Sequence, residues 1–147
     1  SIDAFYDIDA TALFLRECGA LRVALQFPDE LLPEAPEVLW SLQTRLAAQE
    51  PEPLLFITGD TSYGSCCVDE ISAQHLGADG VVHYGRACLT PTAAAVPVWY
   101  VFGRGEIDIG AVAAQVKDSG MMQQGRLVVV YETAYAHCTL ELKEALQ

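Results

Sequence analysis

The chain has 147 residues, which is enough for one domain around a single core, and 52% of them are hydrophobic. Its formal net charge of −12, from 8 basic and 20 acidic residues, argues against a surface that binds nucleic-acid phosphates. No apolar run approaches the ~18 residues that a membrane-spanning helix needs, so we also expect no membrane segment.

Helix-like and strand-like patterns alternate along the whole chain. A first helix is expected near 10–16, and a longer one ends before Pro51 and starts near Glu34, because Pro33 and Pro36 confine its beginning. Further helices are expected at 68–76, where Gly77 would be the C-terminal cap, at 107–116, and from Ala136 onward. The expected strands cover 21–27, 54–58, 80–84, 98–102 and 127–131.

Most of the expected strands are continuously apolar, which is typical of a parallel sheet covered on both faces. We therefore predict a three-layer α/β fold, a mostly parallel sheet of four to five strands with helices on both faces. Trp40 and Trp99 lie on apolar faces and are expected in its core. Residues 1–147 are expected to form a single domain. Because the chain begins at Ser1 without Met and stops at Gln147 inside a helical pattern, we expect a piece of a longer protein.

Cysteines follow three of the expected strands. The loop after the second strand reads GDTSYGSCCVDE over 59–70 and holds the adjacent pair Cys66 and Cys67. HYGRAC ends the third strand and brings Cys88, and YETAYAHC follows the fifth and ends at Cys138. Because ligands bind at the carboxyl ends of the strands in an open parallel sheet, we expect these segments to converge at one edge.

The adjacent cysteines have three interpretations that the residues alone leave open. A strained disulfide, a reactive thiol, and ligands of a soft metal or iron–sulfur cluster all suit cysteines in a turn rich in Gly, Ser and Thr. No C-x₂-C spacing occurs, so a cluster would draw its cysteines from separated loops. Successive side chains point in different directions in a strand or helix, so we expect one of Cys66 and Cys67 to reach the common centre and the other to pack inward.

The remaining candidate residues have simpler structural interpretations. Cys18 is expected to be a small buried residue, and His75 to be a surface residue or to have its hydrogen bonds satisfied. We expect His83 to make a structural hydrogen bond and His137 to mark a helix start. No phosphate-binding loop, dinucleotide fingerprint or nucleophile elbow occurs. The odd number of cysteines, without paired spacing, favours a reducing, cytoplasmic setting.

Several segments resemble the diphthamide biosynthesis proteins (the Dph1/Dph2 family) in their order and spacing. The resemblance covers most of the chain, corresponds to the family's amino-terminal domain, and is closer to the second subunit, Dph2, than to the first. The segments are LQFPDELL (25–32), GDTSYGSCCVDE (59–70), GADGVVHYGRACL (77–89), VPVWYVFG (96–103) and VVVYETAYAHC (128–138).

The resemblance implies a subunit of 2-(3-amino-3-carboxypropyl)histidine synthase. Family members use a [4Fe–4S] cluster and, as substrate, S-adenosylmethionine in an unconventional radical reaction. The reaction moves the 3-amino-3-carboxypropyl group onto a histidine of elongation factor 2. The implied partners are a Dph1-like subunit in a heterodimer, elongation factor 2 and an electron donor protein. Family members have three similar α/β domains, of which this chain would be the first.

For the site, the resemblance implies Cys67, or its neighbour Cys66, as a cluster ligand and Cys88 as a second one. A further ligand would come from a domain outside this chain, so the chain alone is expected to fold and to be catalytically inert. The sequence identifies no catalytic residue and no S-adenosylmethionine pocket. One alternative is a non-catalytic heterodimer partner or scaffold with structural cysteines. A weaker alternative is a thiol redox domain that uses Cys66 and Cys67.

Overall fold

The computed structural model describes residues 1–59, 64–93 and 96–147. Residues 60–63, in the first half of the GDTSYGSCCVDE loop, lie outside the described residues. The chain divides into two compact units, 1–103 and 104–147, each with its own internal packing.

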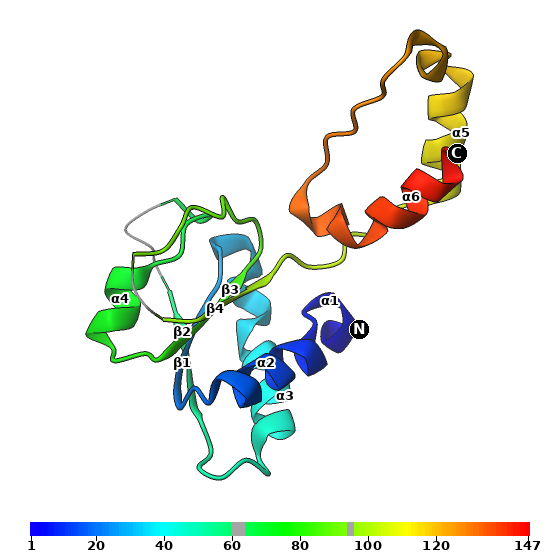
Figure 1. Ribbon diagram of the computed structural model, residues 1–147. Helices are drawn as coiled ribbons and strands as arrows, with labels where there is room; N and C mark the ends of the chain where they lie inside the picture. Colours follow the sequence, from blue (N-terminus) through cyan, green and yellow to red (C-terminus); the bar gives the residue numbers. More distant parts are fainter. Residues whose placement is uncertain (60–63, 94–95) are drawn as a thin grey trace. The chain divides into compact units, whose positions relative to one another are not determined.

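The first unit is built on four parallel strands (Figure 1). They are β1 (Arg22–Gln26), β2 (Leu54–Thr58), β3 (Gly80–Tyr84) and β4 (Val98–Val101), and their order across the sheet is β2-β1-β3-β4. The prediction of a parallel α/β sheet with four to five strands is therefore confirmed. Because these strands are parallel, the loops that follow β2 and β3 leave the same edge of the sheet, on either side of β1.

Helices cover both faces of this sheet, as the sequence predicted. Helices α2 and α3 lie on one face and α4 on the other (Figure 1). Helix α3 starts at Ala35, so that Pro36 lies in its first turn, where a proline is tolerated. A 3₁₀ turn at Asp29–Glu34 precedes it and contains Pro33. The helices of this unit are α1 (Ile2–Phe5), α2 (Ile8–Cys18), α3 (Ala35–Leu46) and α4 (Glu70–His75).

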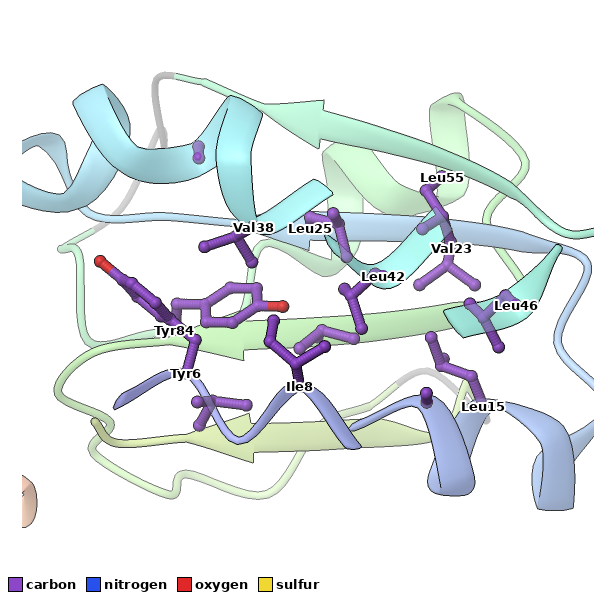
Figure 2. Close-up of a cluster of buried hydrophobic side chains, with 14 of the residues drawn as sticks. Tyr6, Ile8, Leu15, Val23, Leu25, Val38, Leu42, Leu46, Leu55 and Tyr84 are labelled. Atoms are coloured by element: carbon purple, nitrogen blue, oxygen red, sulfur yellow. The ribbon is translucent and has the colours of Figure 1, made fainter. Parts of the chain in front are cut away.

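The main core fills the space between the sheet and helices α2 and α3 (Figure 2). Large apolar side chains of β1, β2 and β3 meet those of the two helices there. An aromatic group closes the core near the carboxyl ends of the strands, where the rings of Phe27 and Tyr84 stack with centroids 4.2 Å apart. Tyr6 packs edge-on against both rings, and its hydroxyl donates to Glu34 Oε2 at 2.7 Å.

The opposite face of the sheet carries smaller side chains. Ala24 and Val81 of the strands pack there against Ala73 of α4 and Ala78 after it. Asp69 caps the first turn of α4, since its Oδ1 accepts from the Ser72 backbone N–H at 3.0 Å. Small residues let this short helix and the preceding loop lie close to the strands.

The second unit contains the two remaining predicted helices and no strand among the residues that the structure describes. Helix α5 covers Ile109–Asp118 and α6 covers Thr139–Ala145, with 3₁₀ turns at Met121–Gln124 and Thr133–Cys138. The strand predicted at 127–131 is wrong.

The run 127–131 is apolar and β-branched, which produced the strand prediction, but it pairs with no strand within the described residues. A strand needs a neighbour for its backbone hydrogen bonds. Val128 and Val130 are 80% and 91% exposed. Within its unit, this run therefore has no partner strand among the described residues, and these two side chains are not buried in a core.

Two burial predictions are also wrong, and one is confirmed. Trp40 is 71% exposed, because the buried stripe of α3 runs through Val38 and Leu42 at helical spacing and leaves Trp40 on the far side. Cys18 is exposed because it lies in the last turn of α2. Trp99 packs against the main core and stacks on Phe14. None of the described helices is both long and apolar enough to cross a membrane.

The start of β3 provides a test of the sheet packing. A Cβ at Gly80 would lie 2.9 Å from the Cβ of Ala20, closer than side chains in proteins tolerate. We expect Gly80→Ala to lower the free energy of unfolding by ~1–3 kcal/mol through overpacking, measured by chemical denaturation. Gly59→Ala is the control, because a Cβ there meets no atom of the described residues within 4 Å. Equal losses in both variants would contradict this packing.

Candidate metal centre

Three cysteine side chains meet at the carboxyl edge of the sheet. The Sγ atoms of Cys66, Cys67 and Cys88 all lie within 4.8 Å of one another. Cys67 Sγ is 3.6 Å from Cys88 Sγ and 4.0 Å from Cys66 Sγ. Cys66 and Cys67 are half-buried and Cys88 is exposed, so an ion or a cluster could reach all three sulfurs from solvent.

Two loops bring these cysteines together. The first follows β2 and closes a tight turn in which the Cys67 N–H donates to the Gly64 carbonyl at 2.9 Å. The second follows β3, and the Cys88 N–H donates to the Cys66 carbonyl at 2.9 Å. That bond joins the two loops directly, so it holds their thiols close together at the edge of the sheet.

The expectation that one of the adjacent cysteines packs inward is wrong. It assumed a strand or helix, in which neighbouring side chains diverge, but Cys66 and Cys67 lie in a turn. The turn lets both sulfurs face Cys88. The five cysteines of the chain are all free thiols, so the adjacent pair forms no disulfide.

The thiols of Cys67 and Cys88 have shifted pKa values of opposite direction. The pKa of Cys88 is lowered to about 7, first because the Thr90 hydroxyl, 3.1 Å away, stabilises the thiolate, and then because of backbone and Cys67 contacts. The pKa of Cys67 is raised to about 11, first by its hydrogen bond to Cys88 and then by that to Cys66. The geometry therefore favours a Cys88 thiolate that accepts a hydrogen bond from the Cys67 thiol.

The donor set suits a soft metal or an iron–sulfur cluster. Its three donors are sulfur atoms, and thiolates select such centres over Mg²⁺ or Ca²⁺. The nearby carboxylates are used elsewhere: Asp69 binds the N–H and hydroxyl of Ser72, and Glu70 accepts from the Ala93 N–H at 3.0 Å. A [4Fe–4S] cluster is commonly held by four thiolates, so three leave one position for a ligand from elsewhere. The residues fit such a group.

The histidines of the first unit have structural or surface positions, and the expected convergence of Cys138 on this edge of the sheet stays a prediction. His83 is fully buried and its Nε2 donates to the Arg86 carbonyl at 3.0 Å, which confirms the predicted structural hydrogen bond. Burial lowers the pKa of His83. His75 is exposed on α4, as expected. In the second unit, His137 Nε2 lies 2.9 Å from the Sγ of Cys138, just before α6.

Two residues of the site escaped the sequence analysis. Thr90 contacts the Cys88 sulfur. Its position two residues after a cysteine is the sequence feature that could have identified it as a contact of that thiol. Gln26 contacts the backbone of the Cys67 loop. It could have been identified as a polar residue at the end of a largely apolar strand.

The unequal pKa values predict which thiol reacts first in the metal-free chain. Raising the pH through about 7 converts Cys88 to thiolate while Cys67 stays protonated. We expect brief treatment with iodoacetamide to modify Cys88 before Cys67, at a rate that rises through this pH and then levels off, as read by peptide mass mapping. Thr90→Val, which removes the stabilising hydroxyl, should move the rise to higher pH. Faster modification of Cys67 would contradict this assignment.

Comparisons with known proteins place the chain in a family. The family model described as "Putative diphthamide synthesis protein" matches residues 27–147. A relative from Gallus gallus, "2-(3-amino-3-carboxypropyl)histidine synthase subunit 2", is 43% identical over 144 residues, which are 98% of this chain and 29% of the relative. A relative of the same name from Danio rerio is 40% identical over 141 residues, which are 96% of this chain and 27% of that relative.

A solved structure has a similar fold. The crystal structure of Dph2 from Pyrococcus horikoshii with a 4Fe–4S cluster matches with a TM-score of 0.70 and 25% sequence identity, covering 95% of this chain and 39% of that one. The chain thus spans less than a third of the length of the two curated relatives. With the family model matched over most of its length, the chain belongs to the diphthamide synthesis protein family.

Proposed function

We propose that the chain is part of the Dph2-like subunit of a 2-(3-amino-3-carboxypropyl)histidine synthase and contributes ligands to a [4Fe–4S] cluster. One observation carries the proposal: Cys66, Cys67 and Cys88 converge on one point at the carboxyl edge of a parallel sheet. Relatives that bear the name of this synthase subunit, and a structural neighbour described with a 4Fe–4S cluster, support it.

The proposed reaction transfers the 3-amino-3-carboxypropyl group of S-adenosylmethionine to a histidine of elongation factor 2, the first step of diphthamide biosynthesis. When bound, the cluster supplies one-electron chemistry at an iron atom. The chain's own residues hold it: Cys67 and Cys88 are the proposed ligands, with Cys66 as the third candidate. Thr90 stabilises the ligand form of Cys88.

The rest of the enzyme lies outside this chain in the proposal. A Dph1-like subunit forms the heterodimer, an electron donor protein supplies reducing equivalents, and elongation factor 2 is the protein substrate. Residues 1–147 correspond to the first of three similar α/β domains, which fits the 29% of the Gallus gallus relative that the chain spans. The chain alone is then catalytically inert. The free thiols support a reducing compartment, so the proposed location is the cytoplasm.

A non-catalytic scaffold is the second candidate function. The observation that favours it is the apolar run 127–131, in which Val128 and Val130 are almost fully exposed and could contact another protein chain. In that case the cysteines would have no part in the reaction. The two candidates differ in what cysteine substitutions do to the assembled enzyme.

The deciding experiment uses the full-length protein purified anaerobically with its Dph1-like partner. We expect an EPR signal of a reduced iron–sulfur cluster from this subunit. Cys67→Ala and Cys88→Ala should each remove most of that signal and lower its iron and sulfide content, because each deletes a ligand. Cys66→Ala shows whether the third sulfur also binds.

Cys18→Ala is the matched control. Cys18 is an exposed free thiol just before β1, so it lies at the opposite edge of the sheet from the three clustered sulfurs. Its replacement should leave the EPR signal and the transferase activity intact. Unchanged spectra and full activity in the three cluster variants would favour the scaffold.

A further inference from the structure

A row of side chains crosses the sheet directly beneath the cysteine loops. Gln26 at the end of β1 is in register with Thr58 of β2 and with His83 of β3, and His83 is in register with Tyr100 of β4. Side chains two positions apart on a strand share a face, so the row lies on the same face as Ala24, toward α4. Each strand therefore has a polar or aromatic side chain on this face at its last or next-to-last residue, under the site.

Gln26 holds the loop that carries Cys66 and Cys67. Its Nε2 donates to the Cys67 carbonyl at 2.7 Å, and its Oε1 accepts from the Asp69 N–H at 2.9 Å. The side chain is 2% exposed, so no solvent replaces these bonds. A carbonyl only accepts and an N–H only donates, so the two contacts fix the orientation of the amide. One side chain thus ties down the backbone at a cysteine and two residues beyond it.

His83 holds the loop that carries Cys88. It is fully buried and its Nε2 donates to the Arg86 carbonyl at 3.0 Å, two residues before Cys88. The Tyr100 ring packs edge-on against the imidazole, with centroids 5.6 Å apart, and restricts its rotation. The tautomer follows from the contact, because the carbonyl needs a donor at Nε2.

The sheet thereby aligns the two cysteine loops. Gln26 and His83 are neighbours across β1 and β3, and the loops that they hold are joined by the bond from the Cys88 N–H to the Cys66 carbonyl. Without these anchors, two solvent-exposed loops would have to be ordered by the metal or cluster itself, at a cost in conformational entropy.

We propose that Gln26 and His83 are positioning residues that hold the three thiols together before any metal or cluster binds. The inference rests on the proposed function, since it concerns the same three sulfurs. Neither side chain touches a sulfur in the hydrogen bonds described, so each acts through the loop backbone. Losing either anchor is expected to weaken the binding of a thiophilic ion roughly 10- to 100-fold, the range typical for outer-shell partners of metal ligands.

The test titrates the 147-residue chain with Cd²⁺, a soft ion whose bonds to thiolates absorb in the near ultraviolet. All variants carry Cys18→Ser and Cys138→Ser, so that the remaining thiols are those of the cluster. We expect Gln26→Leu and His83→Phe each to weaken Cd²⁺ binding by that factor. Cys67→Ser, which removes one sulfur, should weaken it further.

Two controls separate positioning from general stability. Thr58→Val changes a buried member of the same row whose hydroxyl, among the described residues, donates to the Leu25 carbonyl at 3.4 Å, so it should leave Cd²⁺ affinity unchanged. Gly80→Ala destabilises the sheet without touching either loop, and it too should bind Cd²⁺ normally while it remains folded. If the controls lose as much Cd²⁺ affinity as Gln26→Leu and His83→Phe, then Gln26 and His83 stabilise the fold and have no specific positioning role.

The outcomes also separate this inference from the proposed function. If the parent chain binds Cd²⁺ no better than Cys67→Ser, the three-thiol site fails and the proposed function loses its basis. If Cys67→Ser weakens binding but Gln26→Leu and His83→Phe do not, only the positioning role is overturned. Circular dichroism verifies folding; should Gln26→Leu not fold, Gln26→Glu, which keeps an acceptor for the Asp69 N–H, replaces it in the same comparison.

Discussion

The parallel pairing of β1 with β2 on one side and β3 on the other is the constraint on which the rest of the first unit depends. Parallel strands end at the same edge, so two loops whose cysteines are 21 residues apart in sequence become neighbours. Register matters as much as direction. A slip of one residue between β1 and β3 would turn Gln26 toward the opposite face and remove it from the loop that it holds.

One face of the sheet packs against the main core and the other lies under the cysteine loops, and the side chains of the two faces differ accordingly. The face under α2 and α3 carries the large core, including the stacked rings of Phe27 and Tyr84. The buried apolar residues between the other face and α4 are alanines and a valine, which bury less apolar area but allow a close approach of backbone. The cysteine loops lie on this thinner side, where an amide as short as that of Gln26 reaches them. Stability is thus concentrated on one face and ligand positioning on the other.

The sequence predicted the parts that follow from periodicity and missed those that depend on tertiary contacts. Continuous apolar runs bounded by Pro and Gly located the four strands of the sheet, and the loops after β2 and β3 located the cysteines. The turn that directs both Cys66 and Cys67 toward Cys88 has no such pattern, because its shape depends on individual backbone hydrogen bonds. The roles of Gln26 and Trp40 depend on which neighbours fold against them, and a strand at 127–131 depends on a partner strand.

The extended run at 127–131 also has a consequence for the behaviour of the chain in solution. It is uncharged, contains no proline and is rich in β-branched residues, and its backbone edges pair with no strand in the described residues, which are the properties of a template for strand addition. Arg126 and Glu132 flank it with charge, and the net charge of −12 makes two copies repel each other. Salt screens that repulsion but leaves the apolar run intact. Higher ionic strength therefore weakens the charge repulsion that opposes self-association through this run.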